Sequence, residues 1–179
     1  MRSRYEVGRE MMEMNTDLIR CEAEQCDRVE DILFYSSQAG GTASGMLTRI
    51  IKDIDVSICP KSSRVLYSVV PSANGLGSEV VTHLNNVLAI HEKLNLNLLD
   101  IWVDNASLYR ICETYLGIES PSLEDINRLV AQQASSLTQS RRFGGTKNKT
   151  FGELRSNLIS YPHLEFFSTS RAFLPQTPP

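Results

Sequence analysis

Short apolar runs alternate with longer amphipathic stretches along most of the chain. Three mostly apolar stretches, at 32–37, 65–70 and 98–103, predict buried strands. The stretch at 65–70 is nearly continuous, as in a parallel sheet that is covered on both faces. A shorter strand is expected at 164–167. Elsewhere apolar residues recur at helical spacing and predict helices at 8–27, 46–55, 79–94, 105–116, 121–139 and 151–158.

This order of elements predicts an α/β fold with a mostly parallel sheet and helices on both faces, since parallel strands need crossover connections. Ligands of such sheets bind outside the carboxyl ends of the strands. The turn at 39–45, the loop at 71–77 and Asn105 each follow a predicted strand. The sequence therefore predicts a binding site at that edge of the sheet.

The helix predicted at about 121–140 has clear boundary signals. We expect Ser120 to cap its N-terminus, with Pro121 at the first helical position, and Gly144 and Gly145 to end the helical region. Its apolar stripe consists of Leu123, Ile126, Val130, Ala134 and Leu137.

Composition and charge narrow the class of protein. The 179 residues are enough for one domain with a core, and a net charge of −3 with 22% charged residues is not typical of proteins that bind nucleic acid. No apolar run approaches the roughly 18–20 residues that span a bilayer, and no secretory signal is evident. The cysteines and histidines lack metal-ligand spacing, so we expect buried, reduced thiols and no metal site.

The turn Ala39–Gly45 carries the clearest candidate chemistry. It joins a predicted strand to a predicted helix, and the backbone N–H groups at a helix N-terminus attract phosphate. Glycines let the backbone approach phosphate oxygens without a Cβ in between. On motif logic alone, a tight strand-to-helix turn that binds no ligand is the favoured alternative.

The order of residues in this turn resembles the tubulin signature, Gly-Gly-Gly-Thr-Gly-Ser-Gly, with alanine at the first and fifth places. Further segments resemble the tubulin family in the same order along the chain. They are Tyr5–Glu10, Ser68–Ser72, Val103–Cys112, Ile126–Val130, Asn157–Pro162 and Phe166–Phe167. On these matches the chain is identified as a member of the tubulin family.

The resemblance implies a divergent, α-like segment of the tubulin GTPase domain at 1–143, then an interface loop and the start of the intermediate domain at 144–179. It implies GTP or GDP as ligand, tubulin subunits of the heterodimer and the microtubule lattice as partners, and a place in the cytoplasm and cytoskeleton. Neither a membrane nor a nucleic acid is expected as a partner.

The family pattern begins well upstream of this chain. The opening strand, a Gly-Gln-rich turn and the acidic loop that helps to hold Mg²⁺ have no counterpart here, and most of the C-terminal half of the pattern is also absent. We therefore expect exposed apolar faces and an unpaired strand edge.

By resemblance, the nucleotide phosphates contact Ser37, Gly40, Gly41, Thr42 and Ala43. Small side chains, a hydroxyl and backbone amides suit that role. Ala43 would be strained, by about 1 kcal/mol or more, if its position requires a positive φ.

The resemblance also places Ser78 near the ribose and assigns Asn105 and Asn127 to the guanine. A side-chain amide suits a base edge because it both donates and accepts hydrogen bonds. The alternatives are a helix-capping role for Asn105 and a solvated position for Asn127.

Two departures from the family pattern weaken the nucleotide site. Thr82 stands where the family has a ribose-binding carboxylate, and Leu123 stands where a tyrosine stacks on the guanine. Loss of such stacking removes roughly 1–3 kcal/mol. We therefore expect weak GTP binding at best and no autonomous GTPase activity.

Glu153 matches the α-tubulin glutamate that promotes hydrolysis of GTP held by the next subunit. Such a carboxylate orients or deprotonates the attacking water. Thr150 replaces an aspartate nearby, and the alternative for Glu153 is an exposed acid on a short helix. Arg141 and Arg142 are expected to form a solvated basic edge.

Three functional readings remain open from the sequence. The first is a GTP-binding tubulin that polymerises head to tail, with nucleotide binding impaired. The second is a non-polymerising module that binds tubulin or caps a filament. The third is a truncated gene product without autonomous function.

Overall fold

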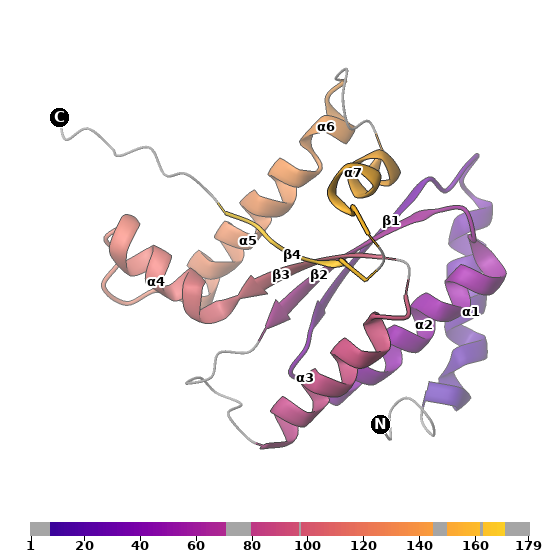
Figure 1. Cartoon of the computed structure of the whole chain (residues 1–179), viewed down its shortest axis with the longest axis horizontal. Coiled ribbons are helices and arrows are strands. Elements are labelled where there is room, and N and C mark those ends of the chain that lie inside the picture. Colours follow the sequence, from indigo (N-terminus) through magenta and orange to yellow (C-terminus); the bar gives the residue numbers. More distant parts are fainter. Residues whose placement is uncertain (1–7, 71–79, 97, 145–149, 162, 171–179) are drawn as a thin grey trace.

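The sheet is mostly as predicted from the sequence. The computed structural model describes residues 8–70, 80–96, 98–144, 150–161 and 163–170. Within them, parallel strands pair in the order β1-β2-β3-β4 (Figure 1), with bounds β1 Asp31–Ser37, β2 Ser63–Val70, β3 Leu99–Asp104 and β4 Phe166–Ser168. The α/β fold with a parallel sheet is therefore confirmed.

Helices cover both faces of this sheet (Figure 1). On one face lie α2 (Leu47–Asp53) and α3 (Val80–Lys93), and on the other lie α4 (Asn105–Tyr115), α5 (Leu123–Leu137) and α7 (Phe151–Leu158). The helix α1 (Gly8–Glu24) packs on α2 and on the helical segment η3 (Ile54–Ile58) that follows it. The short helix α6 (Gln139–Arg142) continues from α5.

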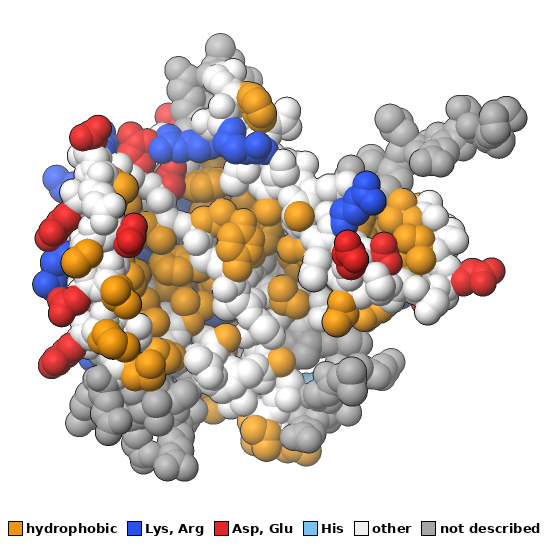
Figure 2. Space-filling model, turned by 180° about the vertical axis from the view of Figure 1, so that it is seen from behind, with side chains coloured by type: hydrophobic (Ala, Val, Ile, Leu, Met, Phe, Trp, Pro, Cys, Tyr) orange, Lys and Arg blue, Asp and Glu red, His pale blue; other side chains and the backbone are white. Residues whose placement is uncertain are grey.

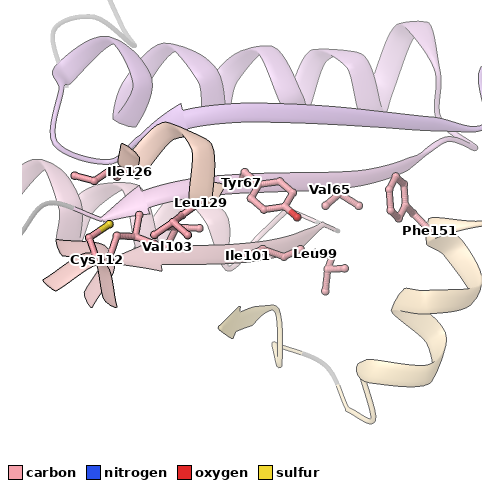
Figure 3. Packing of buried hydrophobic residues seen from close by; sticks show 10 residues of the cluster. Val65, Tyr67, Leu99, Ile101, Val103, Cys112, Ile126, Leu129 and Phe151 are labelled. Atoms are coloured by element: carbon pink, nitrogen blue, oxygen red, sulfur yellow. The ribbon is translucent and has the colours of Figure 1, made fainter. Parts of the chain in front are cut away.

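The larger core lies between the sheet and the helices α4, α5 and α7. Alternate residues of β2 and β3 point into it because side chains of a strand alternate between faces. Figure 3 shows Phe151 of α7 beside Val65 and Leu99 at the amino ends of the strands, while Cys112 of α4 and Val103 lie toward the carboxyl ends. Its buried members are Val65, Tyr67, Leu99, Ile101, Val103, Leu108, Cys112, Ile126, Leu129 and Phe151.

The strand β2 behaves as its continuous apolar run predicts. Val65, Leu66, Tyr67 and Ser68 are all fully buried, so neither face of this central strand meets solvent. The proposed division at residue 144 stays a prediction. In the described part of the chain, β4 pairs with β3 and Phe151 belongs to the core formed by β2 and β3.

Several helix boundaries differ from the predictions, and α1 ends at Glu24 rather than at residue 27. The N-cap of α5 is Ser122 rather than Ser120, because Ser122 and Asp125 form a reciprocal capping box. The helix after the glycine-rich turn begins earlier than expected, with the wide-turn segment η2 (Thr42–Met46), and ends with a second one, η3 (Ile54–Ile58). None of the described helices is both long and apolar enough to cross a membrane.

An apolar surface is left open along β1, as expected. Among the described residues no strand pairs with its outer edge. Met11, Met14 and Leu18 of α1 are 40 to 60% exposed, and Tyr35 of β1 is 58% exposed. Figure 2, the view from behind, shows apolar side chains spread over this side of the molecule. The amphipathic stripe of α1 is thus real, but much of it faces solvent.

The expectation of buried thiols is wrong for half of the cysteines. Cys112 is buried in the core and Cys59 is half-buried, but Cys21 and Cys26 are exposed on the last turn of α1 and just after it. All are free thiols.

A buried ion pair joins α3 to the sheet. The Nζ atom of Lys93 donates to Asp100 Oδ2 at 2.9 Å and to Ser68 Oγ at 2.8 Å, and Ser68 Oγ donates to Asp100 Oδ1 at 2.5 Å. All are inaccessible to solvent or nearly so. Burial lowers the pKa of Lys93, and the Asp100 carboxylate opposes this. Each charge is therefore compensated inside the fold by the other.

Glu165, just before β4, is a half-buried acid. Its Oε2 atom is buried without a hydrogen-bond partner in the described structure. Burial raises the pKa of Glu165 to about 7, Asp100 adds to the shift, and His163 and Arg155 oppose it. Below about pH 7 the folded protein therefore favours the protonated carboxyl.

Lys93→Met should lower the free energy of unfolding by about 3–5 kcal/mol, because it leaves the Asp100 carboxylate unpaired in the core. The double variant Lys93→Met/Asp100→Leu removes both charges and should recover most of that loss. Urea denaturation measures both. Equal instability of the single and double variants would show that charge pairing is not what matters there.

Glu165→Gln should stabilise the protein at pH 8 and change little at pH 4. The pKa of Glu165 is about 7 in the folded protein, above its ordinary value of 4.5. The free energy of unfolding therefore falls as the pH rises from about 4.5 to about 7, because over this range the unfolded chain has released the proton that the folded protein still holds. After allowance for partial exposure, the gain at pH 8 should be roughly 1–2 kcal/mol. Thermal melts across this pH range test it, with the exposed Glu113→Gln as control.

Candidate functional site

The predicted phosphate cradle lies where β1 ends. Ser37 closes the strand, and its Oγ accepts a hydrogen bond from Ala39 N at 3.3 Å. The helical segment begins at Gly41 and Thr42, and Ser44 N donates back to Gly40 O at 3.0 Å. The first turn of a helix directs N–H groups outward without helical acceptors. The turn therefore presents a helix start at the carboxyl edge of the sheet.

The space above Gly40 and Gly41 is open. A Cβ added at either position would meet no atom within 4 Å. Gly41 has ordinary right-handed helical angles, with φ −63° and ψ −30°, so the backbone itself does not require glycine there. Open space over glycines beside a helix start fits a phosphate group that approaches the backbone closely.

Ala43 is not strained. It lies inside η2, and the described non-glycine residues with positive φ do not include it. The predicted penalty depended on a positive φ and does not arise. Thr42 is exposed beside it, so its hydroxyl is accessible from the same side of the turn.

Asn105 is the first residue of α4, but it does not cap that helix. The cap is Asp104, whose carboxylate accepts from Ala106 N at 3.2 Å and Ser107 N at 3.1 Å. The capping alternative for Asn105 is therefore wrong. Its half-buried side-chain amide lies at the carboxyl end of β3, two strands from the cradle.

Asn127 and Leu123 lie one turn apart on the outer face of α5. Asn127 is exposed, and Leu123 is 72% exposed. The opposite face of the helix, with Ile126 and Leu129, packs into the core. Asn127 is accessible to a ligand, and the leucine beside it offers no aromatic face for a base.

Ser78 and the loop at 71–77 lie outside the described residues. Thr82, at the position of the family's carboxylate, lies in the first turn of α3 and is half-buried.

Glu153 lies far from the cradle. It is exposed in the first turn of α7, and its N–H donates to Thr150 Oγ1 at 3.1 Å, so Thr150 caps that helix. Phe151, two residues earlier, packs beside Val65 at the amino end of β2 (Figure 3). The cradle is at the carboxyl end of β1. The structure therefore does not bring Glu153 together with the other candidate residues.

Arg141 is not part of a solvated basic edge. It forms ion pairs with Glu30 and with Asp31, the latter at 3.0 Å from Arg141 Nε to Asp31 Oδ2. Arg141 lowers the pKa of Glu30, and burial raises the pKa of Asp31 while Arg141 opposes that rise. Arg142 donates to Ser135 O and stacks on Phe143.

Sequence reasoning missed Gln38, which lies between β1 and the cradle. Gln38 is 1% exposed, and neither the nitrogen nor the oxygen of its side-chain amide has a hydrogen-bond partner among the described groups. Its backbone N–H donates to Val69 O at 3.0 Å, so the residue still pairs with β2. Its signal in the sequence was a polar residue directly before the glycine-rich turn; its burial is visible only in the structure.

The arrangement is the one with which parallel α/β domains bind phosphate groups, a helix start at the carboxyl edge of the sheet. The GTPase domain of the Tubulin/FtsZ family matches residues 1–113. This match covers more than half of the chain, and the chain belongs to that family.

Curated relatives agree with this assignment. The chain is 40% identical over 171 residues to "Tubulin alpha chain-like 3" of Mus musculus. The aligned residues make up 96% of this chain and 38% of that relative. It is 36% identical to "Tubulin alpha chain" of Dictyostelium discoideum over the same share of this chain. It is 38% identical to "Tubulin alpha-2 chain" of Schizosaccharomyces pombe over 92% of this chain. The chain spans 36 to 38% of the length of these relatives.

Gly41→Ala should weaken GTP binding at least tenfold, because its Cβ would occupy the space that a phosphate oxygen needs. Protein stability should change by less than about 1 kcal/mol, since the backbone angles suit alanine. Gly144→Ala is the matched control, because a Cβ there also meets open space but lies outside the cradle. Titration with a fluorescent GTP analogue measures both, and undiminished binding to Gly41→Ala would contradict the cradle.

Proposed function

We propose that this chain is an α-like tubulin segment that takes part in GTP-dependent, head-to-tail assembly with tubulin subunits in the microtubule cytoskeleton of the cytoplasm. GTP or GDP would bind weakly at the cradle of Gly40–Ala43. The names of the relatives, all tubulin alpha chains, support the class of polymer.

The observation that carries the proposal is the placement of two functional groups at opposite ends of the sheet. The cradle lies at the carboxyl end of β1, and Glu153 lies on α7 at the amino end of β2. A strand of eight residues such as β2 is about 26 Å long. One chain therefore cannot place its Glu153 on its own nucleotide, whereas stacking one subunit on the next would bring the two ends together.

Glu153 would act in trans. Its carboxylate is exposed at the start of α7, where it would orient or deprotonate water beside the terminal phosphate of a neighbouring subunit's nucleotide. Thr150 holds the backbone of Glu153 by capping the helix, and this fixes where the carboxylate starts. The chain would hold one nucleotide and act on another.

Nucleotide binding by the chain itself is expected to be weak. Asn105 and Asn127 would contact the guanine edge, and Ser37 and Thr42 would offer hydroxyls to the phosphates. Leu123 cannot stack as an aromatic ring does, and Thr82 supplies no carboxylate for the ribose. By family resemblance Mg²⁺ accompanies the nucleotide, but residues 37–45 include no acid that would hold it.

The trans role of Glu153 predicts a specific kinetic defect. Added to growing microtubules, the chain should occupy filament ends and support phosphate release from the neighbouring subunit. Glu153→Gln should occupy the ends equally but release phosphate at least tenfold more slowly, because the general base is lost. The exposed Glu113→Gln is the control. Failure of the wild-type chain to associate with filaments would contradict the proposal.

A second candidate function is a filament-capping module that does not polymerise. Exposed apolar residues surround the α7 end of the molecule, namely Phe143 at 62%, Leu158 at 41% and Tyr161 at 61%. Such a surface favours contact with another subunit. In the same experiment, slowed growth at low stoichiometry with no effect of Glu153→Gln would favour capping.

A further inference from the structure

Two cysteines line one cleft on the far side of the sheet from α5. The cleft, of about 430 Å³, lies between the end of α1 with the residues that follow it and the turn between η3 and β2. Cys26 lines it from the first segment and Cys59 from the second. Cys21 is also exposed, but it does not line this cleft.

The register of the sheet brings these two segments side by side. Asp31 and Ser63 are the first paired residues of β1 and β2, and Ser63 N donates to Glu30 O at 2.8 Å. Cys26 precedes Asp31 by five residues, and Cys59 precedes Ser63 by four. The two cysteines therefore lie on neighbouring segments, each a few residues before the point where these segments join as a parallel pair. A disulfide requires Cα atoms within about 7 Å of each other, so its formation would draw the two segments together across the cleft.

Both cysteines are held by hydrogen bonds in their segments. Cys59 O accepts from Ser62 N at 3.2 Å and from Ser62 Oγ at 2.8 Å. Cys26 N donates to Ala23 O at 3.2 Å, and its thiol lies 3.6 Å from Glu22 O.

Charged side chains of both signs share this cleft with the thiols. They are Arg20, Arg28, Lys61, Glu24 and Asp27.

We propose that Cys26 and Cys59 are a redox modification site that closes to an intramolecular disulfide in the presence of a peroxide. The exposed Cys26 thiolate attacks hydrogen peroxide, forms a sulfenic acid and releases water. The Cys59 thiol then displaces the sulfenic oxygen as a second water, and the S–S bond forms. Two thiols are oxidised, and one peroxide is reduced to two waters. The disulfide would tie the end of α1 to the start of β2, independently of any nucleotide.

Mass spectrometry of the full chain after treatment with hydrogen peroxide tests this site. Trypsin leaves Cys21 and Cys26 in one peptide, 21–28, so the experiment uses the Cys21→Ser background, in which an exposed thiol is replaced. The expected product is a monomer in which peptide 21–28 is linked to peptide 53–61. Cys21→Ser/Cys59→Ser should lack it, and dithiothreitol should reverse it.

A thermal melt gives the second readout. The oxidised Cys21→Ser protein should melt several degrees higher than the reduced form, because the bond restricts the unfolded chain. Oxidised Cys21→Ser/Cys26→Ser should show no such rise. Recovery of Cys26 as a sulfinic acid or in an intermolecular disulfide, with Cys59 still a free thiol, would overturn the proposal.

Discussion

The buried contact of Lys93 with Asp100 and Ser68 is the constraint on which the arrangement of the elements depends. An ammonium group taken out of water must meet its counter-charge at hydrogen-bond distance, because an unpaired charge in a core costs several kcal/mol. Lys93 ends α3, Ser68 lies in β2 and Asp100 lies in β3. The helix can therefore dock in one place only, across the two central strands.

Parallel pairing fixes the carboxyl edge of the sheet. Because β1, β2 and β3 run in the same direction, their carboxyl ends lie on the same side, where the cradle and Asn105 lie. The opposite edge carries α7, anchored by Phe151 in the core. The polarity of the molecule, with a phosphate cradle at one end and Glu153 at the other, thus follows from parallel pairing. The proposed head-to-tail contact would use this polarity.

The sequence predicted the strands, and the turn that joins β1 to a helix, because their signals are local. The apolar run at 65–70 is a central strand, and the glycine-rich turn starts a helix, as expected. The cap of α5 was misassigned although the decisive signal, Asp125 three residues after Ser122, was present in the sequence. Serines stand on both sides of Pro121, and either could cap a helix. In the structure the N-cap is Ser122, which forms reciprocal hydrogen bonds with Asp125.

Other features depend on distant residues and could not be predicted. Asp100 sits inside an apolar run, and nothing local indicates that Lys93 reaches it. The solvent-facing stripe of α1 follows the helical period that was predicted, but periodicity does not show what covers a face. The convergence of Cys26 and Cys59 became visible only with the register of β1 and β2.

Amide hydrogen exchange of the full chain, with and without millimolar GTP, tests the central claim most directly. If nucleotide binds at the cradle, GTP should slow exchange in 40–44 and at the start of α4, and leave α7 unchanged. Exchange that is unaffected in 40–44, or protection confined to α7, would contradict the assignment of the two ends of the sheet.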